Sequence, residues 1–219
     1  MKNFVDYDFI DTQLVYSTVK VGEMITPVWR QNRWDCGQYQ EFIRNNGCGH
    51  CCVAMVLNLH DIKITPHDEF SECIKLWGMP NAEQEYPQRA YLSISGIYKI
   101  LSHYGVKAEY FGVKSKDKAK EQIDNALKSN KQVIFWSNPN QNDLENPFST
   151  GEHYVLAVGY TKDAKILVAN SSEKASKTGI QLVEINTIVN SLLVGADPQD
   201  LTWGESGPRE RCAGFVVVG

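Results

Sequence analysis

The sequence has no excess of positive charge and no long apolar run. Its 219 residues include 22 Lys and Arg against 26 Asp and Glu, which gives a formal net charge of −4. Nucleic acids and anionic membranes are bound through basic surfaces, so this balance argues against both as partners. No segment approaches the roughly 20 consecutive apolar residues that a membrane-spanning helix needs. We therefore expect neither a nucleic acid nor a membrane as a partner.

The first residues also lack the pattern of a secretory signal peptide. Residues 1–8 mix charged and apolar side chains and do not place a basic segment before an apolar one. The chain has six cysteines, three of them crowded into one turn, which is poor geometry for a disulfide framework. We expect mostly reduced thiols in a cytoplasmic protein, or a secreted protein if the natural N-terminus is longer. A Cys36–Cys212 disulfide stays open.

The order of the expected elements favours one α+β domain that spans residues 1–219. Helical patterns dominate residues 47–130, and strand patterns dominate residues 131–219. We therefore predict a helical lobe packed against an antiparallel sheet lobe, with a cleft between them as the usual place for a site. Residues 1–30 look irregular or extended, with short strands expected only around residues 14–16 and 24–26.

The most informative stretch is residues 45–57, in which polar residues and a glycine lead into Cys48. Gly49 and an apolar run that ends near Leu59 follow, so Cys48 stands where a buried helix begins. Backbone N–H groups and the positive end of the helix dipole favour a thiolate at that position. Cys48 is therefore a candidate nucleophile, and a nucleophile of this kind needs a base and a group that orients the base.

Of the five histidines, His153 is the strongest candidate for the base. It opens an otherwise apolar strand, where a strand end at a cleft leaves an imidazole both oriented and reachable. We interpret the other four, at positions 50, 60, 67 and 103, as surface or lining residues. His50 is only two residues past Cys48, so the two side chains point to different sides of a helix.

Asn170 ends the strand that follows His153, and its amide oxygen is suited to accept the imidazole N–H. The turn around residues 162–164 makes the two strands a hairpin. An even-length loop would place Asn170 and His153 on one face of the sheet, and an odd-length loop would need a bulge to do so. Taken alone, Asn170 also fits an ordinary strand-terminating turn.

These pieces together resemble the papain-like cysteine peptidases, and more closely their bacterial branch of bacteriocin-leader (double-glycine) peptidases. The resemblance spans about residues 25–190. The segments that carry it are Gln31 in an aromatic-rich loop, Gly47-Cys48-Gly49 before Ala54-Met55-Val56-Leu57, Thr65-Pro66, Ser93-Ile94-Ser95-Gly96, Tyr104-Gly105-Val106, Gly151 to Tyr160, and the strand that ends in Asn170.

The resemblance implies a papain-like fold, a peptide or protein substrate and no cofactor. It implies Cys48 as nucleophile, His153 as general base and acid, and Asn170 as the orienting residue. Gln31 and the backbone N–H of Cys48 would form the oxyanion hole. The sequence departs from leader peptidases in two ways, with Asn170 where they usually carry Asp and with Gln31 farther from the nucleophile.

Three alternatives stay open beside hydrolysis of a peptide or isopeptide bond. The same residues would serve an acyltransferase or transpeptidase, because only the second acceptor differs. A papain-like scaffold can also bind peptides without cleaving them. A zinc site is the third alternative, with ligands drawn from Cys48, Cys51, Cys52, His50, Cys36 and Cys73. It lacks the second, well-separated ligand pair of a structural site, and the sequence does not indicate an oligomeric state.

Overall fold

The computed structural model describes residues 4–33, 44, 46–77, 93–137, 147–172, 177–194 and 214–219. The strands are β1 (Val5–Phe9), β2 (Val15–Val21), β3 (Met24–Trp29), β4 (Ala108–Phe111), β5 (Gln132–Ser137), β6 (His153–Tyr160), β7 (Ile166–Ala169), β8 (Ile180–Val183) and β9 (Phe215–Val218). The helices are α2 (Cys48–Leu59), α3 (Pro66–Trp77), α4 (Ile94–His103), α5 (Lys116–Lys128) and α6 (Ile185–Ser191), with a short 3₁₀ turn, η1 (Gln31–Arg33).

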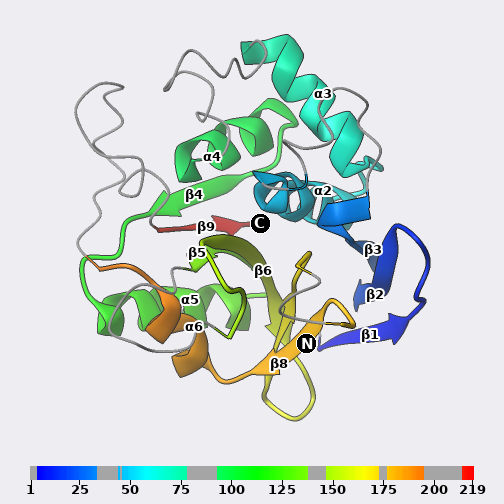
Figure 1. The fold of residues 1–219 in the computed structure, drawn as a ribbon. Helices are drawn as coiled ribbons and strands as arrows, with labels where there is room; N and C mark the ends of the chain where they lie inside the picture. Colours follow the sequence, from blue (N-terminus) through cyan, green and yellow to red (C-terminus); the bar gives the residue numbers. More distant parts are fainter. Residues whose placement is uncertain are drawn as a thin grey trace.

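A six-stranded antiparallel sheet in the order β4-β9-β5-β6-β7-β8 forms the centre of the molecule. Helices α2 and α4 cover one of its faces, and α5 and α6 cover the other (Figure 1). Alternate residues of β5 enter the two cores: Trp136 packs with the α2 side and Phe135 with the α5 side. Because both faces are buried, the central strands are apolar throughout.

The α+β class with antiparallel sheets is thus confirmed, and the predicted helix from Cys48 to near Leu59 is α2. The structure adds that α5 lies on the far face of the sheet, away from α2 and α4 (Figure 1). The helices of residues 47–130 therefore enclose the sheet from both sides. Within the described residues, no helix is both long and apolar enough to span a bilayer.

The N-terminal segment differs from the prediction of irregular chain with short strands at 14–16 and 24–26. It forms a three-stranded antiparallel sheet in the order β1-β2-β3, which packs on α2 through β3 and on β6 through β1. Val19, Val21 and Val28 are buried in this sheet, while Thr18 and Lys20 between them are partly exposed. Strand β1 reads Val-Asp-Tyr-Asp-Phe, which is the alternation of apolar and polar residues typical of a half-buried strand.

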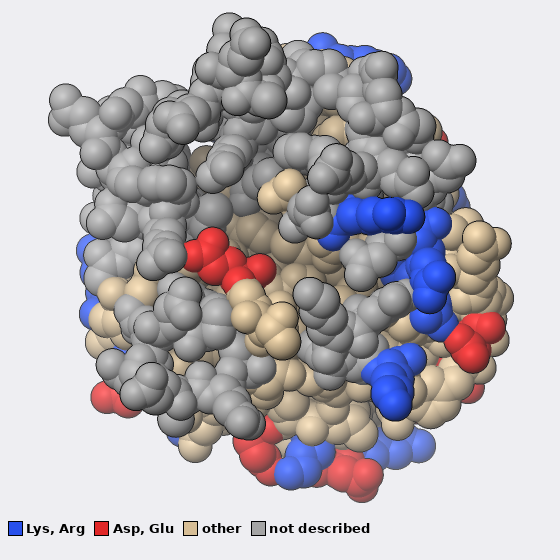
Figure 2. Space-filling view, viewed as in Figure 1, with Lys and Arg blue, Asp and Glu red and all other residues tan. Residues whose placement is uncertain are grey.

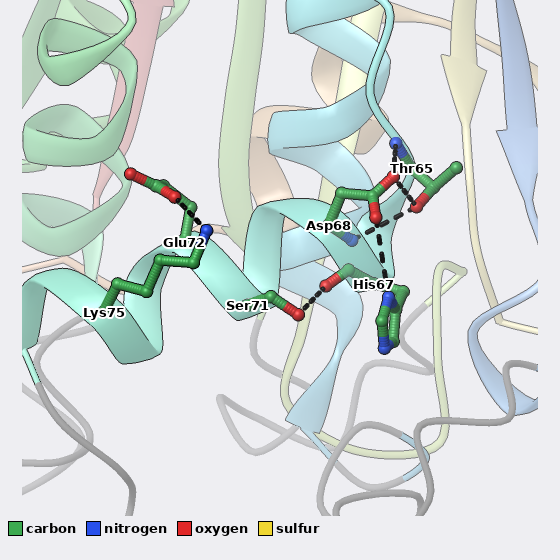
Figure 3. Close-up of polar contacts among 6 residues, drawn as sticks. All are labelled: Thr65, His67, Asp68, Ser71, Glu72 and Lys75. Carbon is green, nitrogen blue, oxygen red and sulfur yellow. Dashed lines mark hydrogen bonds and ion pairs between the residues drawn. The ribbon is translucent and has the colours of Figure 1, made fainter.

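Helix α2 runs through the middle of the helical side, and every residue from Gly49 to Leu59 is buried. A helix that is apolar all round must be enclosed by other elements. Helix α3 begins at the predicted Thr65-Pro66 boundary, where the Thr65 hydroxyl accepts the Asp68 N–H at 3.1 Å and donates to the Asp68 carboxylate at 2.7 Å (Figure 3). This reciprocal cap fixes the start of α3, and hence which of its side chains face α2.

Candidate active site

The hairpin of β6 and β7 brings His153 and Asn170 to the same face of the sheet. Tyr160 pairs with Ile166, which leaves the odd number of five residues, 161–165, in the loop. The register then shifts by one between Ala157 and Gly159, so the hairpin contains the bulge that an odd loop requires. Without this bulge, the alternation of side chains would place Asn170 on the opposite face from His153.

Asn170 is completely buried, and each of its side-chain hydrogen-bonding positions is used. Its Oδ1 accepts from the ring of His153 at 2.8 Å and from the Ser172 N–H at 2.9 Å. Its Nδ2 donates to the Phe148 carbonyl at 2.9 Å and to Gln181 Oε1 at 2.8 Å. A backbone carbonyl only accepts and a backbone N–H only donates, so the amide cannot be flipped.

This fixed amide defines the protonation of the His153 ring. The oxygen of Asn170 requires a donor, so Nε2 of His153 carries the proton and Nδ1 keeps its lone pair. Burial disfavours the imidazolium and lowers the pKa of His153 to about 4, although the hydrogen bond to Asn170 opposes the change. At neutral pH, His153 is therefore a free base held in one tautomer.

Cys48 is the first residue of α2 and is partly exposed, whereas the other described cysteines, Cys51, Cys52 and Cys73, are buried thiols. Its sulfur lies beside the backbone N–H groups of Cys48, Gly49 and Tyr154. The last of these belongs to the residue that follows His153, so the sulfur lies against the end of β6 from which the imidazole projects. Within the described residues, no hydrogen bond joins the thiol to the His153 ring.

The expected preference of Cys48 for the thiolate is wrong for the resting site. The N–H groups at the start of α2 do lower the pKa of the thiol, as the helix end predicts, and the Tyr154 N–H adds to them. Burial of the sulfur acts in the opposite direction and is the larger effect, so the net pKa of Cys48 is raised. The site at rest holds a neutral thiol and a neutral imidazole.

Gln31 lies at the same end of the sheet and connects three segments. Its backbone N–H donates to the Ser171 carbonyl at 3.1 Å, and its side-chain Nε2 donates to the Arg44 carbonyl at 2.9 Å. Ser171 follows Asn170, and Arg44 precedes the start of α2. The structure thus brings Gln31 close to the end of β7 and to the segment before α2, and one of its two amide hydrogens is engaged by Arg44.

Charged and uncharged described residues lie side by side on the surface around these elements, with Asp and Glu side chains directly beside the uncharged middle (Figure 2). Figure 2 shows uncharged described residues in the middle of the face on which Figure 1 draws α2 and β6. Lys and Arg side chains gather to one side, near β2 and β3, with Asp and Glu beside them. Residues 138–146 and 195–211 lie outside the described residues, as do Cys36 and Cys212 of the open disulfide.

The expectation that His50 is a surface or lining residue is wrong. It is buried, and its Nδ1 pairs with the carboxylate of Glu69 on α3. The Glu69 carboxylate also accepts from the thiol of Cys73 at 3.1 Å. The His50–Glu69 pair joins residues 19 positions apart, which no local pattern reveals. His60, His67 and His103 are partly or fully exposed, as expected.

The zinc alternative takes a different form from the one expected. Among the described residues, the group with metal-ligating atoms close together is His50, Glu69 and Cys73, with all three atoms within 4.8 Å of one another. Cys51 and Cys52 instead pack into the apolar core with α2. The predicted set centred on Cys48-x-x-Cys51 is therefore not the one that the fold gathers.

Sequence reasoning did not identify Gln181 of β8 as part of the site. Its Oε1 accepts from Asn170, and its Nε2 donates to the Pro147 carbonyl at 2.6 Å. A glutamine in the middle of a short, half-exposed strand does not by itself indicate a role in a functional site. Its contacts hold Asn170 and the turn at residues 147–148 together.

Comparisons with known proteins place the chain in a family. The profile of the Peptidase_C39 like family matches residues 26–191, which is most of the chain and nearly the range of the resemblance stated from the sequence. A protein from Bacillus anthracis, provisionally assigned as a C39-like peptidase, has a crystal structure that aligns with a TM-score of 0.48 at 13% identity, covering 80% of this chain and 89% of that one. No curated protein matches the chain. The match over residues 26–191 shows that the chain belongs to the C39-like peptidase family.

Proposed function

We propose that the protein is a cysteine peptidase in which Cys48 is the nucleophile and His153 the general base and acid. Asn170 orients the imidazole, and Gln31 with the backbone N–H of Cys48 stabilises the oxyanion. The observation that carries the proposal is the fully bonded Asn170 amide, which holds His153 as a free base at the strand end where the Cys48 sulfur lies. Family membership supports the same reaction class.

In the proposed reaction, Nδ1 of His153 takes the thiol proton as the Cys48 sulfur attacks the carbonyl carbon of the substrate. The oxyanion that forms accepts hydrogen bonds from Gln31 and the Cys48 N–H. The C–N bond then breaks as His153 gives its proton to the leaving amine, and a thioester remains. Water, deprotonated by His153, attacks this thioester and releases the acid together with the restored thiol.

The neutral resting pair gives this scheme a distinctive pH behaviour. Because the pKa of Cys48 is raised, only a small fraction of its thiol is ionised at neutral pH. We expect the rate of alkylation by iodoacetamide to rise about tenfold per pH unit between pH 6 and 8. A site with a stable thiolate–imidazolium pair would instead give a nearly constant rate over that range.

Electrophile labelling followed by mass spectrometry tests the assignment of nucleophile and base. Cys48 should be labelled far faster than buried Cys73, and its labelling by a peptidyl electrophile should slow in His153→Ala. His60→Ala, at the end of α2, is the matched control and should leave the rate unchanged. Equal labelling of Cys48 and Cys73, or unchanged labelling in His153→Ala, would contradict the proposal.

A fluorogenic peptide library, with Cys48→Ser as the blank, tests turnover. We expect cleavage by the unmodified chain, none by the blank, and a loss of about 10²–10³ in kcat for Gln31→Ala if its amide serves the oxyanion. Mass analysis of products in the presence of an added amine separates hydrolysis from acyl transfer. Cleavage that survives in Cys48→Ser would rule out the nucleophile.

A further inference from the structure

A second cluster of reactive side chains lies between α2 and α3, outside the proposed catalytic residues. His50 comes from the first turn of α2, and Glu69 and Cys73 stand one turn apart on the facing side of α3. Their exposed fractions are 2%, 1% and 0%. The His50 ring pairs with one carboxylate oxygen of Glu69, and the Cys73 thiol donates to the other at 3.1 Å. An imidazole, a carboxylate and a thiol thus share one buried position.

Glu69 differs from the nearby glutamate of α3 in its burial and in its partners. Glu72, one turn away on α3, is partly exposed and makes ordinary surface pairs with Lys75 and His103 (Figure 3 shows the former). Glu69 is instead fully buried, and its two oxygens are held by the His50 ring and by the Cys73 thiol. Both of these partners carry atoms that bind metal ions, so the buried carboxylate is surrounded by metal-ligating groups.

We propose that His50, Glu69 and Cys73 bind one divalent ion of the zinc class. Imidazole nitrogen, carboxylate oxygen and thiolate sulfur are the ligand atoms that Zn²⁺ takes in proteins. The three atoms already lie within 4.8 Å of one another, and tetrahedral coordination requires separations of ~3–4 Å, so a small closure of α2 on α3 completes the site. Water takes the fourth position.

The charges and protons of this site balance. Binding replaces the proton of the Cys73 thiol, which leaves to solvent, and the Nδ1 proton of His50 moves to Nε2 as Nδ1 becomes a ligand. The double positive charge of the ion is then matched by the carboxylate of Glu69 and the thiolate of Cys73. The result is a neutral group in a buried position, which the free carboxylate is not.

The ion would join the start of α2 to α3 without touching the candidate nucleophile. His50 is two residues after Cys48, so the two side chains leave the helix on different sides. The site is independent of peptide cleavage, and its presence does not depend on the proposed function. Because the ligands are buried, the ion is taken up as the two helices pack together during folding.

Elemental analysis of the purified chain, produced in minimal medium with added Zn²⁺ and handled without chelators, tests the site. We expect about one zinc per chain in the unmodified protein. Glu69→Gln and Cys73→Ser should hold at least tenfold less, whereas the matched variants Glu72→Gln and Cys52→Ser should keep it. Far-ultraviolet circular dichroism confirms folding of each variant. An unmodified chain without zinc would overturn the proposal, whatever the variants do.

Production in medium with Co²⁺ in place of Zn²⁺ identifies the ligands directly. A cobalt–thiolate charge-transfer band should appear in the unmodified chain and in Cys48→Ser, and should be absent from Cys73→Ser. Loss of the band in Cys48→Ser or Cys51→Ser with its retention in Cys73→Ser would place the ion at the Cys-x-x-Cys pair and refute this site. Peptidase activity enters neither measurement, so this test and that of the proposed function fail independently.

Discussion

Two histidines of this chain are buried, and they differ in the group that holds them. His153 gives its Nε2 proton to the neutral amide of Asn170, whereas His50 is paired through Nδ1 with the carboxylate of Glu69. Both rings are nearly inaccessible, at 4% and 2% exposure. Burial therefore does not separate the two sites, and the difference lies in the charge of the acceptor.

The comparison shows what a neutral acceptor provides. An amide fixes the plane and tautomer of the ring but adds no negative charge that would stabilise the imidazolium. Burial is therefore the larger effect, and it lowers the pKa of His153 to about 4. The ring stays a base with an open Nδ1. At His50 a carboxylate opposes the ring, and the same carboxylate accepts from the Cys73 thiol, an arrangement that suits a structural or metal-binding role better than proton transfer.

The largest expected effect comes from moving His153 to the face of the sheet opposite Asn170. Deleting Val155 keeps Leu156 paired with Ala169 but shifts His153 by one position along β6, which turns its side chain to the other face, away from Asn170. We expect peptidase activity to fall at least about 10³-fold, the scale of a lost general base. Kinetics with the best library peptide measures the loss.

Deletion of Asp163 is the control for that experiment. It shortens the exposed turn by one residue and leaves the pairing and the bulge of the two strands intact. Activity should stay within a few-fold of the unmodified chain. Comparable activity in the two deletion variants would show that activity does not require His153 on the face of the sheet that carries Asn170.

The next largest effect is expected from replacing Asn170, the neutral acceptor of the His153 proton, with a charged residue. Asn170→Asp removes the donors to the Phe148 carbonyl and to Gln181 Oε1, and sets a carboxylate oxygen against both acceptors. We expect a loss of ~2–4 kcal/mol in the free energy of unfolding at pH 8, and a higher pKa of His153 because of the opposite charge. Urea denaturation and NMR titration of the ring measure the two effects.

Asn125→Asp, on the exposed side of α5, makes the same chemical change where no buried acceptor depends on the amide. Its unfolding free energy should change by less than ~0.5 kcal/mol. If Asn170→Asp proved equally mild, the amide of Asn170 would not be required by its surroundings.

The lowered pKa of His153 also makes folding stability depend on pH. The unfolded chain binds a proton at His153 near pH 6.5 and the folded chain only near pH 4, so the stability contributed by burying the neutral ring is complete above pH 6.5. It is lost as the pH falls from 6.5 towards 4, by up to ~3 kcal/mol. Urea midpoints between pH 8 and 4 measure this loss.

His153→Gln should remove that part of the pH dependence, while His60→Gln, at the end of α2, should keep it. An identical decline of stability with acid in His153→Gln and the unmodified chain would mean that another group is responsible. The His50–Glu69 pair is unchanged in both variants. A difference between them therefore assigns the pH dependence of stability to His153 and not to that pair.

The smallest effect is expected at Gly179, whose carbonyl accepts the Asn170 N–H at 2.8 Å. Its φ is +70°, and a Cβ there would lie 2.7–2.9 Å from atoms of the Tyr16 side chain. Gly179→Ala should cost ~1–2 kcal/mol in unfolding free energy. Gly151→Ala, where nothing lies within 4 Å of a Cβ, should cost under ~0.5 kcal/mol. Equal losses would argue against strain at Gly179.

Local patterns were sufficient to predict the elements that carry the site but not how they meet. The start of α2 at Cys48 and of α3 after Thr65 follow from glycine, capping and apolar signals within a few residues. The hairpin of β6 and β7 was also visible, and the condition that an odd loop needs a bulge followed from the alternation of side chains. Whether the loop is odd depends on pairing, which a single sequence leaves ambiguous.

Contacts across long separations account for what was missed. The N-terminal sheet is stabilised by Val5, which meets β6 at Gly159, where a Cβ would lie 2.8 Å from the valine. The burial of His50 depends on Glu69, and the raised pKa of Cys48 depends on enclosure of α2 by other elements. Each is a property of the assembled core, so no pattern in one segment carries it.

The position of β9 has a consequence for the timing of synthesis. This strand, Phe215–Val218, is inserted between β4 and β5, although it follows every other strand in the chain. While residues 215–218 are still inside the ribosome, nothing bridges β4 to β5, and the core under α4 stays open on that side. The hairpin with His153 and Asn170 emerges earlier, yet the sheet to which it belongs is completed only by β9, so a nascent chain cannot close this sheet before residues 215–218 have left the ribosome.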